Sequence, residues 1–226
     1  MKSFKYEMHT HTCDISKCAS ISAEALVQFY KDQGYSGICV TNHFIGGNTT
    51  IPKDLSWEEQ INCYCSAYER ALSYGQKIGI SVFFGFEYSY RGTDFLVYGL
   101  EKDWLIRHPD FVNLKLKDLL AFLRAEDGFV IQAHPYRESS YIDMIRLLPR
   151  NVDGVEAINS SRPDFENDRA KEYAENYDLL QIGGSDNHNG YQKRLSGIQS
   201  TRELTNIKDI INAIKNKKVE IFVDYL

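Results

Sequence analysis

Five of the six histidines in this 226-residue chain directly follow short apolar segments of the kind that form β-strands. They are His9, His11, His43, His134 and His188, and two carboxylates, Glu87 and Asp186, occupy equivalent positions. Neutral imidazoles and carboxylates are the usual protein ligands of zinc, manganese and iron. The pattern therefore indicates a centre for two or three divalent metal ions. The sixth histidine, His108, lies outside the pattern, and we expect it at the surface.

The spacing within two of these motifs supports a shared site. Residues i and i+2 of an extended strand project from the same face. His9 and His11 can therefore face one site together, and so can Asp186 and His188. One pair of this kind is weak evidence for a metal, and its combination with three further strand ends strengthens the prediction.

The segments that position these residues alternate between short apolar runs and longer amphipathic runs. Strands are expected at 4–8, 36–41, 81–86, 94–98, 129–133, 153–158, 179–183 and 219–223, and helices at 22–34, 56–79, 114–125, 164–176 and 208–215. This alternation predicts a mostly parallel sheet covered by helices, as a distorted (β/α)7 TIM-like barrel. No linker-like stretch interrupts the chain, so residues 1–226 are expected to form a single domain. Active sites of such barrels lie at the C-terminal ends of the strands, where the histidines fall.

The composition is that of a globular protein, with 43% hydrophobic and 25% charged residues. Acidic residues outnumber basic ones by 31 to 26, and the net charge of −5 disfavours non-specific binding to nucleic acid. Neither a membrane span nor the apolar core of a signal peptide is visible, so we expect a cytoplasmic protein with no membrane partner. The five cysteines lack disulfide or zinc-finger spacing and are expected to be reduced thiols, with Cys13 closest to a metal motif.

Six segments carry a resemblance to a known family. They are His9-Thr10-His11-Thr12, Val40-Thr41-Asn42-His43, Gly85-Phe86-Glu87, Ala133-His134-Pro135, Gly154-Val155-Glu156-Ala157-Ile158-Asn159 and Gly184-Ser185-Asp186-Asn187-His188. In this order they resemble the motifs of the PHP (polymerase and histidinol phosphatase) superfamily of metal-dependent phosphoesterases, and they cover nearly the whole chain. The resemblance implies a distorted seven-stranded barrel, a cluster of zinc, manganese or iron ions, and hydrolysis of phosphate esters.

The resemblance also implies which residues hold each ion. His9, His11, Glu87 and Asp186 would surround one ion, Glu87 and His134 would bind a second, and His43 and His188 would hold a third. The residues expected to take part directly in the reaction are His43, Glu87, Asp186 and Arg137.

Three positions depart from the family pattern. Asn42 replaces the usual Asp, which removes a carboxylate near the site. The first motif usually supplies a further Asp or His, and Asp14 is the nearest candidate here. Many members carry a His where this chain has Asp94, and an oxygen ligand there favours manganese or iron over zinc. We expect both Asp14 and Asp94 to be metal ligands.

The expected reaction is the in-line attack of a metal-activated water on phosphorus, without a Ser or Cys nucleophile. A bound phosphate also needs a fork of hydrogen-bond donors, which arginine supplies. Arg137, Arg162 and Arg194 follow strand ends and are the expected substrate contacts, together with the amide of Asn159.

The compact length and negative charge favour a phosphatase for a small-molecule phosphate monoester, similar to histidinol-phosphatase. One alternative is a phosphodiesterase or exonuclease acting on nucleotides or oligonucleotides, which predicts a basic groove lined by aromatic rings. Another is a catalytically weak accessory protein that binds metal, as the replacement at Asn42 suggests. Amide hydrolysis is disfavoured because no lysine follows a strand where it would bridge two ions. The sequence carries no signal for the oligomeric state.

Overall fold

The structure, a computed structural model, describes residues 3–226, and in this part of the chain nine strands form one continuous sheet. The strands are β1 (Phe4–Glu7), β2 (Gly37–Val40), β3 (Ser81–Tyr90), β4 (Thr93–Tyr98), β5 (Phe129–Gln132), β6 (Gly154–Asn159), β7 (Leu180–Gly184), β8 (Arg194–Ser200) and β9 (Glu220–Tyr225). Their order across the sheet is β7-β6-β5-β4-β3-β2-β1-β8-β9, so β1 to β7 follow one another in chain order. This order is that of a barrel in which each strand lies beside the next.

The two ends of this seven-strand series meet just beyond β1 and β7. Thr10 and Asn187 form a parallel bridge, and the backbone N–H of His11 donates to the carbonyl of Asn187 at 3.0 Å. This bridge nearly closes the sheet at the end of the barrel where the histidines lie. The expected distorted α/β barrel is thus confirmed.

The strand β4 departs from the expectation of a mostly parallel sheet. It pairs antiparallel with β3 on one side and with β5 on the other. Arg91 and Gly92, with φ of 48° and 80°, form the whole connection between β3 and β4. A two-residue turn of this kind joins antiparallel strands, whereas a parallel pair needs a much longer crossover.

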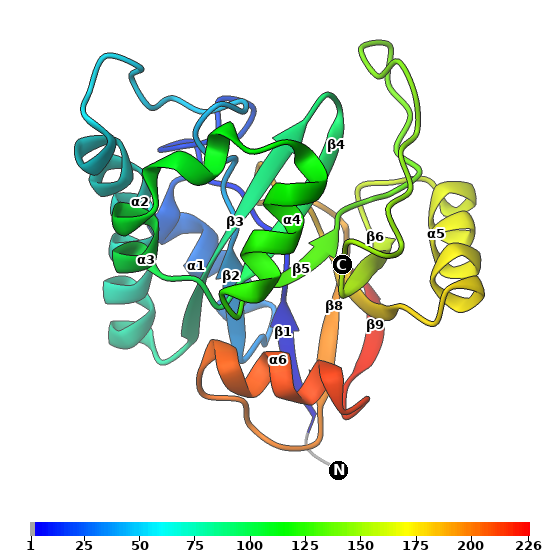
Figure 1. Ribbon diagram of the computed structural model, residues 1–226. Coiled ribbons are helices and arrows are strands. Elements are labelled where there is room, and N and C mark those ends of the chain that lie inside the picture. The colour runs from blue at the N-terminus through cyan, green and yellow to red at the C-terminus, as the bar shows by residue number, and fades with distance from the viewer. Residues whose placement is uncertain (1–2) are drawn as a thin grey trace.

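The strand β8 was not expected from the sequence. Its segment contains only two large apolar residues, Leu195 and Ile198, so the hydrophobic pattern of a strand is weak there. In the structure β8 pairs antiparallel with both β1 and β9. In Figure 1, β8 and β9 lie to the right of β1, and β9 is the outer strand at this end of the sheet.

Helices surround the sheet (Figure 1). They are α1 (Ala23–Asp32), α2 (Trp57–Ile78), α3 (Lys102–Arg107), α4 (Leu116–Ala125), α5 (Asp164–Asn176) and α6 (Ile207–Lys215), with a 3-10 turn at Pro109–Asn113. All five expected helices are present, and α3 is additional. A capping box between Ser56 and Glu59 starts α2, and Gly79 ends it with a left-handed φ of 74°. Within residues 3–226, none of the helices combines the length and apolar character needed to cross a bilayer.

Candidate metal centre

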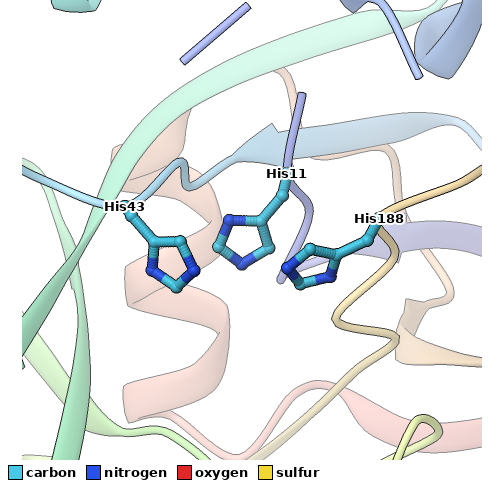
Figure 2. Close-up of side chains that lie close together, drawn as sticks. All are labelled: His11, His43 and His188. Carbon is cyan, nitrogen blue, oxygen red and sulfur yellow. The ribbon is translucent and has the colours of Figure 1, made fainter. Parts of the chain in front are cut away.

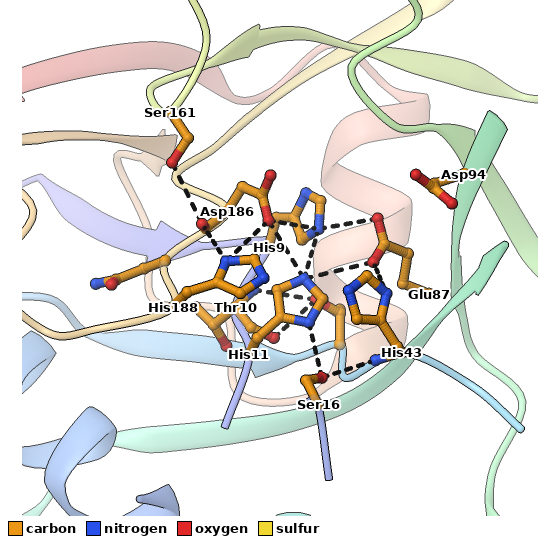
Figure 3. Close-up of polar contacts among 12 residues, drawn as sticks. His9, Thr10, His11, Ser16, His43, Glu87, Asp94, Ser161, Asp186 and His188 are labelled. Atoms are coloured by element: carbon orange, nitrogen blue, oxygen red, sulfur yellow. Dashed lines mark hydrogen bonds and ion pairs between the residues drawn. The ribbon is translucent and has the colours of Figure 1, made fainter. Parts of the chain in front are cut away.

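The predicted ligands meet at one end of the barrel, within or just beyond the strands that converge there (Figure 3). His9 and His11 follow β1, His43 follows β2, Glu87 lies in β3, Asp94 lies in β4, His134 follows β5, and Asp186 and His188 follow β7. An isolated parallel bridge between His43 and Glu87 extends the pairing of β2 with β3 into this cluster. The barrel therefore brings eight of the nine predicted ligands together.

The first group consists of His9, His11 and Asp186. The Nε2 atoms of the two histidines are 3.1 Å apart. Oδ1 of Asp186 lies 3.5 Å from Nε2 of His9 and 3.3 Å from Nε2 of His11. Glu87 closes the group, with its two oxygens 3.3 and 3.4 Å from these same nitrogens. Four side chains thus direct ligand atoms at one point.

The second group consists of His9, Glu87 and His134. Oε1 of Glu87 lies 3.5 Å from Nε2 of His134 and 3.3 Å from Nε2 of His9. Oδ2 of Asp94 and Oδ2 of Asp186 each lie 3.9 Å from Nε2 of His134. Glu87 is therefore placed to bridge the first and second groups.

The third group consists of the imidazoles of His11, His43 and His188, which face one another from three separate segments (Figure 2). The ring centroid of His11 lies 4.4 Å from that of His43 and 4.2 Å from that of His188. Nδ1 of His43 is 2.6 Å from Oε2 of Glu87, so this carboxylate reaches all three groups.

The cluster fits divalent cations, because several of its buried atoms have no other partner. Nδ1 of His43, Nε2 of His134 and both oxygens of Glu87 are buried and, among the described residues, have close polar neighbours only within the cluster itself. Leaving such a group unsatisfied costs about 1–3 kcal/mol, and more for a charged group. A cation bound between the carboxylates and imidazoles satisfies all four atoms at once.

Three histidines are held in the tautomer that leaves Nε2 free to bind a metal. Nδ1 of His9 lies 3.0 Å from the carboxylate of Glu156, and Nδ1 of His188 lies 2.8 Å from the carbonyl of Asp186, so each Nδ1–H donates. Nδ1 of His11 lies 3.0 Å from Oγ of Ser16. The Ser16 hydroxyl donates to Oδ1 of Asn42, so it must accept from His11. Such outer contacts orient metal ligands and raise their basicity.

Glu156 was part of a recognised motif but had no assigned role. It is fully buried, and its second oxygen accepts hydrogen bonds from the backbone N–H of His134 at 3.0 Å and from the amide of Asn159 at 2.9 Å. The signal that could have identified it is its position in β6 at the same barrel level as the ligands. Asn159 also reaches Oδ2 of Asp186 at 3.4 Å, so it orients carboxylates, whereas a substrate contact was expected.

Mutual charge dominates the protonation of the cluster. Burial opposes a charge on His9, but Glu156, Asp186 and Glu87 outweigh it and raise the pKa of His9 well above its usual value. Burial likewise opposes charge on His43, whereas Glu87 raises the pKa of His43 to about 11. Burial and the neighbouring His188 and His43 hold the pKa of His11 well below its usual value.

Two ligands adopt backbone conformations that L-residues rarely use. His134 has a φ of 25° and Asp186 a φ of 52°. Non-glycine residues in this region cost of order 1–3 kcal/mol and concentrate at functional sites. Each lies two residues past the end of a strand, at the point where the chain leaves the barrel.

Solved structures share this architecture. A two-domain protein from Bacteroides vulgatus, containing a predicted PHP-like metal-dependent phosphoesterase, has a TM-score of 0.76 over 98% of this chain at 16% identity. A candidate metal-dependent phosphoesterase from Bifidobacterium adolescentis gives a TM-score of 0.57 at 16% identity, covering 96% of this chain and 97% of its own. The lesion-specific endonuclease PfuEndoQ from Pyrococcus furiosus gives a TM-score of 0.67 over 97% of this chain at 15% identity.

This chain has the PHP-like fold. It spans 65% of the length of the Bacteroides vulgatus protein and 58% of the length of the endonuclease. No protein-family model matches the sequence, and no curated protein does. The likeness to the PHP-like structures is therefore one of three-dimensional arrangement, reached at low sequence identity.

A pocket of about 490 Å³ opens over the ligand cluster of the PHP-like barrel. Its lining includes Arg137, Tyr141 and Cys18 beside the ligands. The guanidinium of Arg137 lies 3.7 Å from Oδ2 of Asp94 and stacks 5.6 Å from the ring centre of Tyr141, while its buried Nε makes no hydrogen bond. Arg137 therefore shares one pocket with several of the candidate ligands.

The structure does not bring Asp14 into the cluster. Its carboxylate pairs with Arg70 on α2 and accepts a hydrogen bond from the backbone N–H of Ala23 at the start of α1. This role is that of a helix-capping carboxylate, which short polar residues before a helix commonly adopt.

Two of the three expected arginines are also engaged elsewhere. Arg162 forms a two-pronged pair with Glu166, at 2.6 and 2.8 Å. Arg194 pairs with Asp164 at 2.6 Å. Neither arginine lines the pocket, because each pairs with a carboxylate in the first turn of α5.

Cys18, and not Cys13, is the thiol beside the centre. Burial opposes ionisation of Cys18, but hydrogen bonds with His188 and His43 outweigh it and lower the pKa of the thiol to about 6. Cys13 is largely exposed, and its partial burial together with the nearby Asp14 raises the pKa of its thiol. The sequence pointed to Cys13, the cysteine nearest His11 along the chain, because only the folded loop brings Cys18 to the two imidazoles.

Proposed function

We propose that this chain is a metal-dependent phosphoesterase of the PHP superfamily, which hydrolyses a small-molecule phosphate monoester. The observation that carries the proposal is that Arg137 lines one pocket with five of the eight imidazole and carboxylate ligands, namely His43, Glu87, Asp94, Asp186 and His188. The PHP-like fold of the neighbours supports it. This chain matches only part of the Bacteroides vulgatus protein and of the endonuclease.

In this proposal, one set of side chains would bind the ions, and Arg137 would bind the phosphate. His9, His11 and Asp186 would hold one ion, with Glu87 bridging toward His134. Divalent ions bound there would supply Lewis acidity toward phosphoryl oxygens and a water of lowered pKa. Glu156 keeps Nε2 of His9 directed at the cluster through its contact with Nδ1.

Arg137 would bind the phosphoryl group opposite the ions. Its guanidinium carries donors that match phosphate oxygens, and its unpaired Nε is already desolvated. Tyr141 stacks on the guanidinium and restricts its orientation. Tyr141 also lines the pocket that receives the alcohol part of the substrate, so a ring or apolar group there would contact an aromatic surface.

A monoester is favoured over a nucleic acid by charge and by the form of the site. The chain carries a net charge of −5, and Arg137 is the one arginine or lysine among the described residues that line the pocket. Binding of a polynucleotide depends on several Lys or Arg contacts to phosphates. The endonuclease neighbour makes cleavage of phosphodiesters the second candidate.

The test compares three substrates on protein loaded with zinc, manganese or iron. We expect phosphate release from 4-nitrophenyl phosphate, with at least tenfold lower rates on bis(4-nitrophenyl) phosphate and on single-stranded oligonucleotides. Asp186→Asn should abolish the activity. Faster cleavage of the diester or the oligonucleotide would replace the monoesterase with a phosphodiesterase. No turnover of any ester by metal-loaded protein would contradict the phosphoesterase itself.

A further inference from the structure

Cys18 lies at the rim of the pocket, beside the third ligand group. Of the three exposed cysteines in residues 3–226, Cys13, Cys18 and Cys63, it is the one that lines this pocket. The imidazoles of His43 and His188 line the same pocket as this thiol. The reaction described above gives this thiol no part.

Backbone hydrogen bonds fix the loop on both sides of Cys18. The N–H of Lys17 donates at 3.0 Å to the carbonyl of Asn48, in the segment that follows His43. The N–H of Ser20 donates at 2.7 Å to the carbonyl of His188 itself. The loop thus ties Cys18 to the two segments that carry the neighbouring histidines, independently of any side-chain contact.

The third group offers a place for one more ligand. The ligand nitrogens of His11, His43 and His188 all lie within 4.8 Å of one another (Figure 2). His43 is only 9% exposed, and its Nδ1 lies 2.6 Å from Oε2 of Glu87. Three nitrogens leave at least one position of a tetrahedral ion to be filled, and sulfur is a common fourth ligand of such ions.

We propose that Cys18 is a thiolate ligand of the third ion, together with His11, His43 and His188. This inference rests on the metal centre proposed above. On binding, the thiol proton leaves to solvent and a sulfur–metal bond forms, with no change of oxidation state. A thiolate directs this position toward zinc or iron rather than manganese. The third ion therefore differs in preference from ions held near Asp94, which meet only nitrogen and oxygen.

Absorption spectroscopy of the full chain with Co²⁺ alone tests this assignment. Metal-free protein is titrated anaerobically, because a cobalt–thiolate bond adds an intense near-ultraviolet charge-transfer band that imidazole and carboxylate ligands do not give. We expect the band in the wild type and in Cys13→Ser, and its loss in Cys18→Ser. Cys18→Ser should keep the weaker visible cobalt bands and bind the last ion at least tenfold less tightly.

The outcomes separate this inference from the metal centre. Visible cobalt bands without the near-ultraviolet band in the wild type, or a band that survives in Cys18→Ser, would overturn the role of Cys18 alone. A wild-type protein that gives no cobalt bands at all would overturn the metal centre as well.

A second measurement needs no variant. Alkylation by iodoacetamide, read by mass spectrometry, should slow at least tenfold at Cys18 when Zn²⁺ is bound, while Cys13 and Cys63 react at unchanged rates. Equal alkylation of Cys18 with and without bound Zn²⁺ would contradict the assignment.

Discussion

The carboxylate of Glu156 lies 3.0 Å from Nδ1 of His9, and both side chains are fully buried. The contact fixes Nδ1 as the donor and turns Nε2 toward Glu87 and Asp186. The other oxygen of Glu156 accepts from the backbone N–H of His134, so one side chain on β6 positions ligands that follow two other strands.

Replacement of Glu156 should therefore weaken metal binding without removing a ligand. Glu156→Gln has one acceptor oxygen for the three N–H groups that the carboxylate now serves, so at least one ligand loses its support. We expect a loss of roughly 10–100-fold in metal affinity, which is usual for such outer partners. Competition with a chromophoric chelator measures it. Glu126→Gln, which alters a surface contact to Trp104, is the control and should bind metal as the wild type does.

Binding of metal should release protons and weaken as the pH falls. Burial opposes charge on His43 and His134, but neighbouring carboxylates raise the pKa values of both, to about 11 for His43. The folded, metal-free protein thus keeps the proton of His43 at neutral pH, and an ion bound there must displace it. We expect affinity to fall about tenfold per pH unit for each proton displaced.

Calorimetric titrations in buffers of different ionisation enthalpy count these protons directly. A binding enthalpy that does not depend on the buffer, with an affinity that is constant between pH 6 and 8, would contradict the carboxylate-held charges.

Arg137→Met should weaken phosphate recognition while leaving the metals in place. Hydrogen bonds to charged groups contribute about 1.5–3 kcal/mol, so the inhibition constant of inorganic phosphate should rise roughly 10–100-fold. Arg124→Met, whose partner is Asp153 outside the pocket, is the matched control. Equal phosphate inhibition in wild type and Arg137→Met would remove Arg137 from the site.

Asn42 should prove to be a structural acceptor. Its Oδ1 accepts from the backbone N–H of Thr12 at 2.7 Å and from Ser16, which in turn supports His11. Asn42→Ala leaves a buried N–H unpaired, at a cost of about 1–3 kcal/mol, and should lower the melting temperature. Asn42→Asp restores the acceptor and should recover most of that loss. A melting temperature equal to wild type in Asn42→Ala would show that the contact contributes little.

The sequence predicted which side chains would lie together, because the barrel rule applies to each strand separately. His43 and His134 follow their strands whatever lies across the sheet, so the hydrophobic pattern locates them. Asp14 was misplaced because proximity in sequence to His11 says nothing of which way a loop turns. In the fold this loop caps α1 with Asp14 and brings Cys18, four residues later, to the metal pocket.

The remaining differences arise from contacts between distant segments. Glu156 becomes an outer partner only when β6 closes against the ends of β1 and β5. Arg162 resembled Arg137 in its position after a strand, but Glu166, one helical turn later, binds its guanidinium. Neither contact leaves a periodic or compositional signal in the chain.

Elemental analysis combined with phosphate release is the most direct test of the central claim. Protein purified without chelators should contain two or three ions per chain and hydrolyse 4-nitrophenyl phosphate in a metal-dependent manner. His9→Ala should lose both properties. His108→Ala should keep both, because His108 stacks on Trp104 away from the cluster. Full metal content and full activity in His9→Ala, or a wild-type chain that binds no ion after metals are added back, would contradict the account.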